Sequence, residues 1–202
     1  MSADWILSDS GTSRIAIDPL DPALGGNVIG GDRRTYHPPL WAFLISRFGI
    51  TSMLDVGCAE GHCVRYFASQ GVSAAGFDGL RANVERAVTP VELHDLRSGP
   101  YLMPVDLVHC CEVVEHIDEQ HLPSLLRTLA NGRVIAMTHA VPGQGGHHHV
   151  NCQPASYWIE RIEALGYAFR SDETAMGKRL IEDSGQWTYF ASSGLIFEAR
   201  QG

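Results

Sequence analysis

Apolar residues fall into two kinds of run, which alternate along the chain from residue 39 onward. Short continuous runs, such as 52–56, indicate buried strands, whereas apolar residues at helical spacing, as in 39–48, indicate amphipathic helices. Strands are predicted at 52–56, 72–77, 91–93, 107–111, 133–138, 167–170 and 195–200, and helices at 39–48, 63–70, 80–87, 119–130 and 155–165. Repeated strand–helix–strand units predict an α/β fold with one doubly wound, mostly parallel sheet and helices on both faces.

Two segments depart from this pattern. Residues 1–38 contain several prolines, the pairs Gly25-Gly26 and Gly30-Gly31, and little apolar periodicity, so they are expected to form an irregular N-terminal arm. Residues 39–202 are expected to form the single folded domain. No clear helix is visible over 171–194, so the strands on either side of it are predicted to be antiparallel neighbours.

Composition narrows the class of protein. A chain of 202 residues with 45% hydrophobic residues can bury one core, and its net charge of -8 disfavours nucleic acids and anionic membranes as partners. The five cysteines include no C-x-x-C pair, which predicts reduced thiols. The chain starts without a signal-peptide pattern and lacks an apolar stretch long enough for a membrane span. We therefore expect a soluble, cytoplasmic protein.

A turn of small residues follows the first predicted strand, at Gly57, Ala59 and Gly61. Small residues let a ligand approach the backbone, and ligands of open α/β sheets bind at the carboxyl ends of the strands. A dinucleotide fingerprint beginning at Gly57 would need glycine where Ala59 and His62 stand, which weakens an NAD hypothesis. Asp55, just before the turn, would repel a diphosphate and attract a cationic amino group.

Two more acidic residues follow predicted strands. Asp78 ends the run 72–77, where a carboxylate can accept hydrogen bonds from both ribose hydroxyls, although NAD enzymes use the same device. Asp95 follows the next strand and is placed to accept from an adenine amino group, while Leu96 packs on the ring. Together these residues predict a site for a nucleoside that carries an amino acid.

Four segments in this order resemble the class I S-adenosylmethionine-dependent methyltransferases: L-D-V-G-C-A-E-G at 54–61, G-F-D at 76–78, H-D-L at 94–96 and V-D-L-V-H-C-C-E-V-V-E-H-I at 105–117. The resemblance runs over about 41–198 and implies a seven-stranded sheet whose last strand is antiparallel. It also implies S-adenosylmethionine as the cofactor, with contacts from Asp55, Gly57, Asp78, Asp95, Leu96 and the backbone near Cys111. Ala59 stands where the family usually has a glycine. The arm 1–38 is then expected to close over the cofactor as a lid.

Candidate residues for the acceptor follow the next two strands. Glu112, Glu115 and His116 have offsets of zero, three and four, so they would share one face of a helix that began there. With His149 they could hold Mg²⁺ or Mn²⁺, which would lower the pKa of an acceptor hydroxyl. Alternatively, the two glutamates simply stabilise a helix N-terminus and His116 packs beneath the cofactor.

The string E-V-V-E-H-I is similar to ubiquinone-biosynthesis O-methyltransferases and their small-molecule relatives. The leading hypothesis is therefore O-methylation of a small-molecule or sugar hydroxyl, with His149, His148 or His116 as the base and His149 favoured. The string also resembles the metal-binding E-x-x-E-H of small-RNA 3′-end 2′-O-methyltransferases, which is the runner-up. N-methylation and a non-catalytic binding protein remain open, and the oligomeric state is not predicted.

Overall fold

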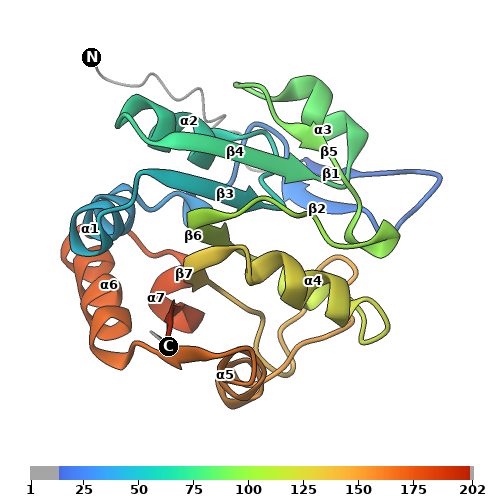
Figure 1. The fold of residues 1–202 in the computed structure, drawn as a ribbon. Helices are drawn as coiled ribbons and strands as arrows, with labels where there is room; N and C mark the ends of the chain where they lie inside the picture. The colour runs from blue at the N-terminus through green and yellow to red at the C-terminus, as the bar shows by residue number, and fades with distance from the viewer. Residues whose placement is uncertain (1–13, 201–202) are drawn as a thin grey trace.

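The computed structural model describes residues 14–200. Its centre is one seven-stranded sheet with the order β5-β4-β3-β6-β7-β9-β8 (Figure 1). The strands are β3 (Ser52–Val56), β4 (Ser73–Asp78), β5 (Glu92–Leu93), β6 (Val105–Cys110), β7 (Gly132–Met137), β8 (Tyr167–Phe169) and β9 (Leu195–Ala199). The strands from β5 to β7 pair in parallel, whereas β9 is antiparallel to both β7 and β8. The predicted fold class, including the antiparallel last strand, is confirmed.

The strand order changes direction between β3 and β6. From β3 the chain moves outward through β4 to β5 and then returns to pair β6 on the other side of β3. The carboxyl ends of β3 and β6 meet where Val56 is paired with Cys110. Such a switch point leaves a crevice outside the strand ends, because the following connections run to different faces of the sheet.

Helices cover both faces of the sheet. One face buries residues of α1 (Pro38–Phe48), α2 (His62–Ser69), α6 (Ser171–Asp183) and α7 (Tyr189–Ser193), and the other buries residues of α4 (Leu122–Leu129) and α5 (Ala155–Glu163). The remaining α-helix, α3 (Arg81–Arg86), packs beside β4 and β5. Neighbouring residues of β6 divide between the two cores, with Leu107 in one and Val108 in the other. This alternation is the period-two pattern of a strand covered on both sides.

The helices α6 and α7 occupy the segment in which no helix was predicted, so that expectation was wrong. Only a narrow stripe of α6 is buried, and Gly177 lies in its middle. A Cβ on Gly177 would lie 2.8 Å from a methyl carbon of Leu40 in α1. The glycine lets two helices approach closely, and it also makes the local sequence a poor helix signal.

The arm is more regular than the sequence predicted. Within the described residues, β1 (Ile15–Ile17) and β2 (Gly25–Val28) form an antiparallel hairpin, and a 3-10 turn, η1 (Arg33–Thr35), follows it. Gly25 has φ +116°, and a Cβ there would lie 2.2 Å from the Ala16 carbonyl oxygen, so the glycine makes the pairing possible. The start of the arm, 1–13, lies outside the described residues.

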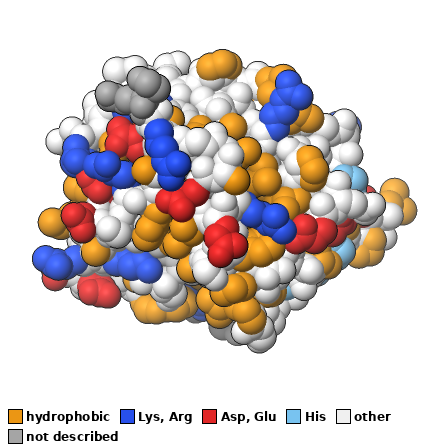
Figure 2. Space-filling model, turned by 60° about the horizontal axis from the view of Figure 1, so that its bottom comes forward, with side chains coloured by type: hydrophobic (Ala, Val, Ile, Leu, Met, Phe, Trp, Pro, Cys, Tyr) orange, Lys and Arg blue, Asp and Glu red, His pale blue; other side chains and the backbone are white. Residues whose placement is uncertain are grey.

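The surface mixes charges of both signs. On the face drawn in Figure 2, basic and acidic side chains alternate and are separated by apolar patches. None of the helices in residues 14–200 is both long and apolar enough to cross a membrane.

Candidate active site

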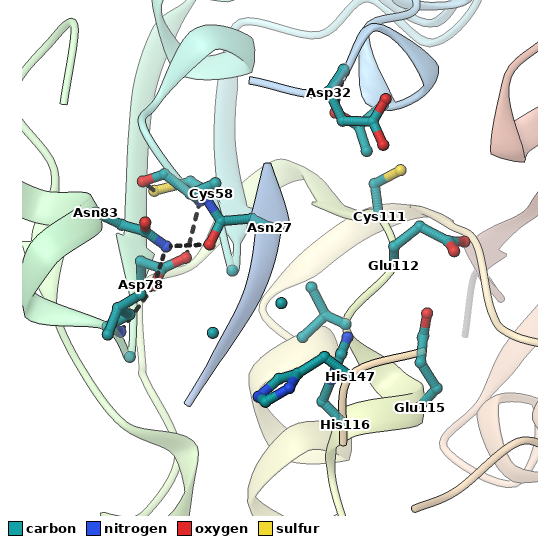
Figure 3. Close-up of a pocket in the computed structure, with 18 of the residues that line it drawn as sticks. Asn27, Asp32, Cys58, Asp78, Asn83, Cys111, Glu112, Glu115, His116 and His147 are labelled. Atoms are coloured by element: carbon teal, nitrogen blue, oxygen red, sulfur yellow. Dashed lines mark hydrogen bonds between the residues drawn. The ribbon is translucent and has the colours of Figure 1, made fainter. Parts of the chain in front are cut away.

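A cavity of about 990 Å³ lies at the switch point of the sheet. Its walls come from the turn after β3, the ends of β4 and β6, the hairpin β1–β2 and the loop 144–149 (Figure 3). This volume is at the upper end of the range of small-molecule sites, roughly 300–1,000 Å³, so it has room for a nucleoside cofactor and a second compound.

The turn after β3 has the backbone that its small residues predicted. Gly57 has φ +64°, and a Cβ there would lie 2.5 Å from a methyl carbon of Val113. Ala59 adopts φ +47°, in the left-handed region that favours glycine. This backbone conformation fits the expectation that glycine usually stands at this position. Both residues line the cavity, whereas Gly61 does not and instead begins α2 beside Val91.

Asp78 is held in place by three hydrogen bonds at the end of β4. Its carboxylate accepts from the Ala59 N–H at 2.8 Å, the Leu80 N–H at 2.8 Å and the Asn83 amide at 3.0 Å. Burial raises the pKa of this carboxyl even though these hydrogen bonds oppose the shift. Figure 3 shows Asn83 reaching from Asp78 to Asn27 of β2, which it contacts at 2.9 Å. Asn83 therefore links Asp78, the residue predicted to bind the ribose, to the N-terminal arm.

Asp95 and Leu96 line the cavity, as predicted, but Asp95 has a protein partner that sequence reasoning missed. Arg97 donates to Asp95 from both Nε and Nη2, and its Nη2 also lies 2.6 Å from Asp21 of the arm. Burial alone would raise the pKa of the Asp95 carboxyl, but the hydrogen bonds and charge of Arg97 outweigh it and lower the pKa. Arg97 follows Asp95 by two residues, although sequence spacing could not reveal the link to Asp21.

Asp55 lies on the floor of the cavity and is buried. Its Oδ1 lies 2.6 Å from Nδ1 of His109, a buried residue of β6 that the sequence analysis did not select. Asp55 and His109 are paired in the register of β3 and β6. Only this strand pairing identifies His109, since the two residues are far apart in sequence.

The cavity continues into an acidic chamber lined by Asp32, Glu112, Glu115, His116 and His149. Glu112 has φ +54°, a conformation that is rare for residues other than glycine and common at functional sites. Its N–H donates to Oγ1 of Thr138 at 2.8 Å, and the same hydroxyl lies 2.8 Å from the Glu112 carboxylate. Thr138 therefore fixes Glu112, and Figure 3 shows the side chains of Cys111, Glu112 and Asp32 around the same space.

Glu115 is fully buried, and neither carboxylate oxygen has a hydrogen-bond partner among the described residues. Burial, followed by the negative charge of Glu112, raises the pKa of Glu115 to about 8. The condition for a shared helical face, a helix that begins at Glu112, is not met: the segment is a 3-10 turn, η3 (Val114–His116), and α4 begins only at Leu122. Because Glu112 precedes the turn, it does not share a helical face with Glu115 and His116.

Three side chains of the chamber converge. Glu115, His116 and His149 each offer a ligand atom, all within 4.8 Å of one another, and Glu112 is outside this group. The rings of His116 and His149 meet edge to face at 5.0 Å, and Nδ1 of His149 lies 3.3 Å from the Gln144 carbonyl. Burial and the neighbouring histidines lower the pKa of His116 to about 4.

His147 and His148, which precede His149 directly in sequence, also line the cavity but have different surroundings. His147 Nε2 lies 2.7 Å from the Pro22 carbonyl of the arm, and His148 has φ +49°. Cys111 also lines the cavity, with its sulfur 3.5 Å from His37. The structure thus brings every predicted site residue except Gly61 to the wall of this one cavity.

A parallel sheet with an antiparallel last strand, a small-residue turn at its switch point and acidic residues after the next strands define a class I, Rossmann-like methyltransferase domain. The chain belongs to the family described as "Methyltransferase domain", whose model matches residues 21–189. This membership implies S-adenosylmethionine as the methyl donor.

Known proteins are similar over different lengths. The ubiquinone biosynthesis O-methyltransferase of Rickettsia typhi is 32% identical over 99 residues, which are 43% of this chain and 40% of that protein. This chain therefore matches less than half the length of that relative. Magnesium protoporphyrin IX methyltransferase from Synechocystis PCC 6803, solved with bound S-adenosylmethionine, has a TM-score of 0.57 at 15% identity, covering 79% of this chain and 76% of that one. The methyltransferase domain of bacterial CtHen1 has a TM-score of 0.56 at 17% identity, covering 82% and 98%. These structures share the fold.

Proposed function

We propose that this protein transfers the methyl group of S-adenosylmethionine to a hydroxyl of a small-molecule acceptor. The observation that carries the proposal is the continuity of one cavity, from the turn after β3 to the acidic chamber. A cofactor seated on Asp55, Asp78 and Leu96 would point its sulfonium toward this chamber. The hairpin β1–β2 forms part of the wall, which favours a compact acceptor over a polymer. The similarity to a ubiquinone biosynthesis O-methyltransferase favours a hydroxyl as the acceptor group.

The reaction requires alignment and removal of one proton. The acceptor oxygen attacks the methyl carbon, a C–O bond forms as the C–S bond breaks, and S-adenosylhomocysteine leaves. The hydroxyl proton passes to a base, for which we propose His149, with His148 or His116 as alternatives. The low pKa of His116 makes it a weak base near neutral pH, so we favour His149 of these two.

We also propose that the acidic chamber can hold Mn²⁺ or Mg²⁺. The residues fit a cation: the carboxylate oxygens of Glu115 and Nδ1 of His116 are buried without partners among the described residues, and His149 lies within reach. One carboxylate and two imidazoles suit Mn²⁺ better than Mg²⁺, which prefers oxygen ligands. When bound, such an ion would stabilise an acceptor alkoxide. Glu112 would act from outside this set, contrary to the sequence-based prediction that it is a ligand.

The test of transfer is formation of S-adenosylhomocysteine with a panel of small phenols, catechols and sugars, their amine counterparts and a short RNA with a free 3′ end. We expect turnover with a hydroxyl compound and its loss in Asp78→Ala. Turnover only with amines would replace O- by N-methylation, and turnover only with RNA would support the runner-up. Cofactor binding without turnover on any class would indicate a binding protein.

The test of the metal is calorimetric titration of the protein with Mn²⁺. We expect binding that Glu115→Ala abolishes and that Glu92→Ala, on the edge strand β5, leaves unchanged. Both variants should retain their affinity for S-adenosylhomocysteine, because Glu115 lies on the acceptor side of the cavity. Absence of Mn²⁺ and Mg²⁺ binding, with full turnover in excess chelator, would eliminate the metal and leave the histidine as the base.

A further inference from the structure

A buried hydrogen-bonded chain runs beneath the cofactor end of the cavity. The indole N–H of Trp41 in α1 lies 3.3 Å from Nε2 of His109, and Nδ1 of His109 lies 2.6 Å from Oδ1 of Asp55. The exposed fractions of Trp41, His109 and Asp55 are 0%, 3% and 4%. Three elements, α1, β6 and β3, therefore meet in one buried hydrogen-bonded chain, which also has the buried side chains of Cys63 and His37 beside it.

The two hydrogen bonds define which ring nitrogen of His109 carries the proton. An indole nitrogen can only donate a hydrogen bond, so Nε2 of His109 must accept from Trp41. The ring proton then resides on Nδ1, which donates to Asp55. A proton on Nε2 would place two donors against each other there, so these contacts select the tautomer that is protonated on Nδ1.

His109 orients the Asp55 carboxylate through the hydrogen bond from Nδ1. Within residues 14–200, no lysine or arginine forms an ion pair with Asp55. A buried carboxylate that lacks a cationic partner is costly, and it is stabilised when a ligand supplies the cation. Asp55 lies at the cavity wall, so such a cation can reach it from the cofactor side.

We propose that His109 is a positioning residue, fixed by Trp41, which aims the Asp55 carboxylate at the primary ammonium group of the amino-acid part of the cofactor. This inference rests on the proposed cofactor but not on the acceptor or on a metal. It explains why a histidine stands at the buried carboxyl end of β6, among the apolar residues Leu107, Val108 and Cys110. Packing alone would need neither the short contact to Asp55 nor the indole donor.

The test compares two ligands that differ in the amino-acid part. S-adenosylhomocysteine carries the ammonium group, whereas 5′-methylthioadenosine keeps the nucleoside and thioether and lacks the amino acid. Calorimetry on the wild type should show binding of both. In His109→Leu, the affinity for S-adenosylhomocysteine should fall about tenfold or more, as expected for the loss of a buried hydrogen bond to a charged group, while that for 5′-methylthioadenosine stays within about twofold.

Two further variants separate the ends of the imidazole. The amide nitrogen of asparagine can replace Nδ1, so His109→Asn should retain most of the affinity for S-adenosylhomocysteine. The longer glutamine places its amide near Nε2, so His109→Gln should lose affinity as His109→Leu does. Trp41→Phe removes the indole donor while keeping an aromatic ring, and it should weaken S-adenosylhomocysteine selectively. These conservative variants carry the test if His109→Leu does not fold.

Nitrogen-15 spectra of the histidine rings give an independent measurement. His109, assigned by its absence in His109→Asn, should show a protonated Nδ1 and an unprotonated Nε2. A protonated Nε2, or equal weakening of both ligands in the variants, would overturn the positioning role. If the wild type bound neither ligand, the proposed cofactor would fail instead, so the two failures can be told apart.

Discussion

At the residue scale, Glu115 is a buried carboxyl group that has no hydrogen-bond partner among residues 14–200. Its pKa is raised from 4.5 to about 8 in the folded chain, chiefly because burial disfavours the charged form. The folded state therefore binds this proton more tightly than the unfolded state does. The contribution of Glu115 to stability is therefore largest below the unfolded pKa and is lost as pH rises from about 4.5 to about 8.

This linkage predicts the behaviour of Glu115→Gln, which keeps the shape of the side chain and cannot ionise. In excess chelator, the melting temperature of the variant should exceed that of the wild type at pH 9 by more than at pH 5. Thermal unfolding at pH 5, 7 and 9 measures the difference, with Glu119→Gln, an exposed residue nearby, as the control. A difference that does not change with pH would show that Glu115 titrates normally.

At the scale of elements, two side chains from other parts of the fold attach the hairpin β1–β2 to the wall of the cavity. Arg97 joins Asp21 of the hairpin to Asp95, and Asn83 joins Asn27 to Asp78. The expected lid over the cofactor stays a prediction, as does the division of the chain at residue 38. These contacts suggest how a lid would respond to the cofactor. Arg97 and Asn83 hold the hairpin, and they also contact Asp95 and Asp78, the residues predicted to bind the adenine and the ribose.

We predict that S-adenosylhomocysteine slows amide hydrogen exchange in 14–38. Asp21→Ala should raise exchange there without ligand, since Arg97 would then pair with Asp95 alone. Asp18→Ala is the matched control, because Asp18 lies in the same turn and only caps the backbone N–H of Leu20. Exchange measured by mass spectrometry that is unaffected by the ligand would argue against a lid.

At the scale of the whole molecule, the cavity joins elements from both halves of the sheet, so a bound cofactor should stabilise the entire domain. S-adenosylhomocysteine at a hundredfold excess over its dissociation constant should add about 2.7 kcal/mol, which is a rise of roughly 5–10 °C in melting temperature for a domain of this size. NAD should give no such rise, because Asp55 at the mouth of the turn opposes a diphosphate. A rise with NAD and none with S-adenosylhomocysteine would contradict the cofactor assignment.

The sequence by itself determined the order of most strands and helices and the place of the small-residue turn after β3. These features are local: apolar periodicity selects strand or helix, and Gly57 and Ala59 accept a backbone that larger residues resist. For the same reason Asp78 and Asp95 could be placed at strand ends before any contact was known. The helix α6 was not predicted, because its buried stripe is narrow and because Gly177, which allows close packing against Leu40, lowers the helix propensity of the segment.

Only the tertiary structure decided which of these residues meet. His109 reaches Asp55 through strand register, Arg97 reaches Asp21 across the arm, and His149 reaches Glu115 from another loop. A shared face for Glu112, Glu115 and His116 required helical backbone from Glu112 onward. The positive φ of Glu112 is not helical, so these three side chains do not share a face. Contacts between distant segments depend on sheet register and loop closure, which no local pattern of residues records.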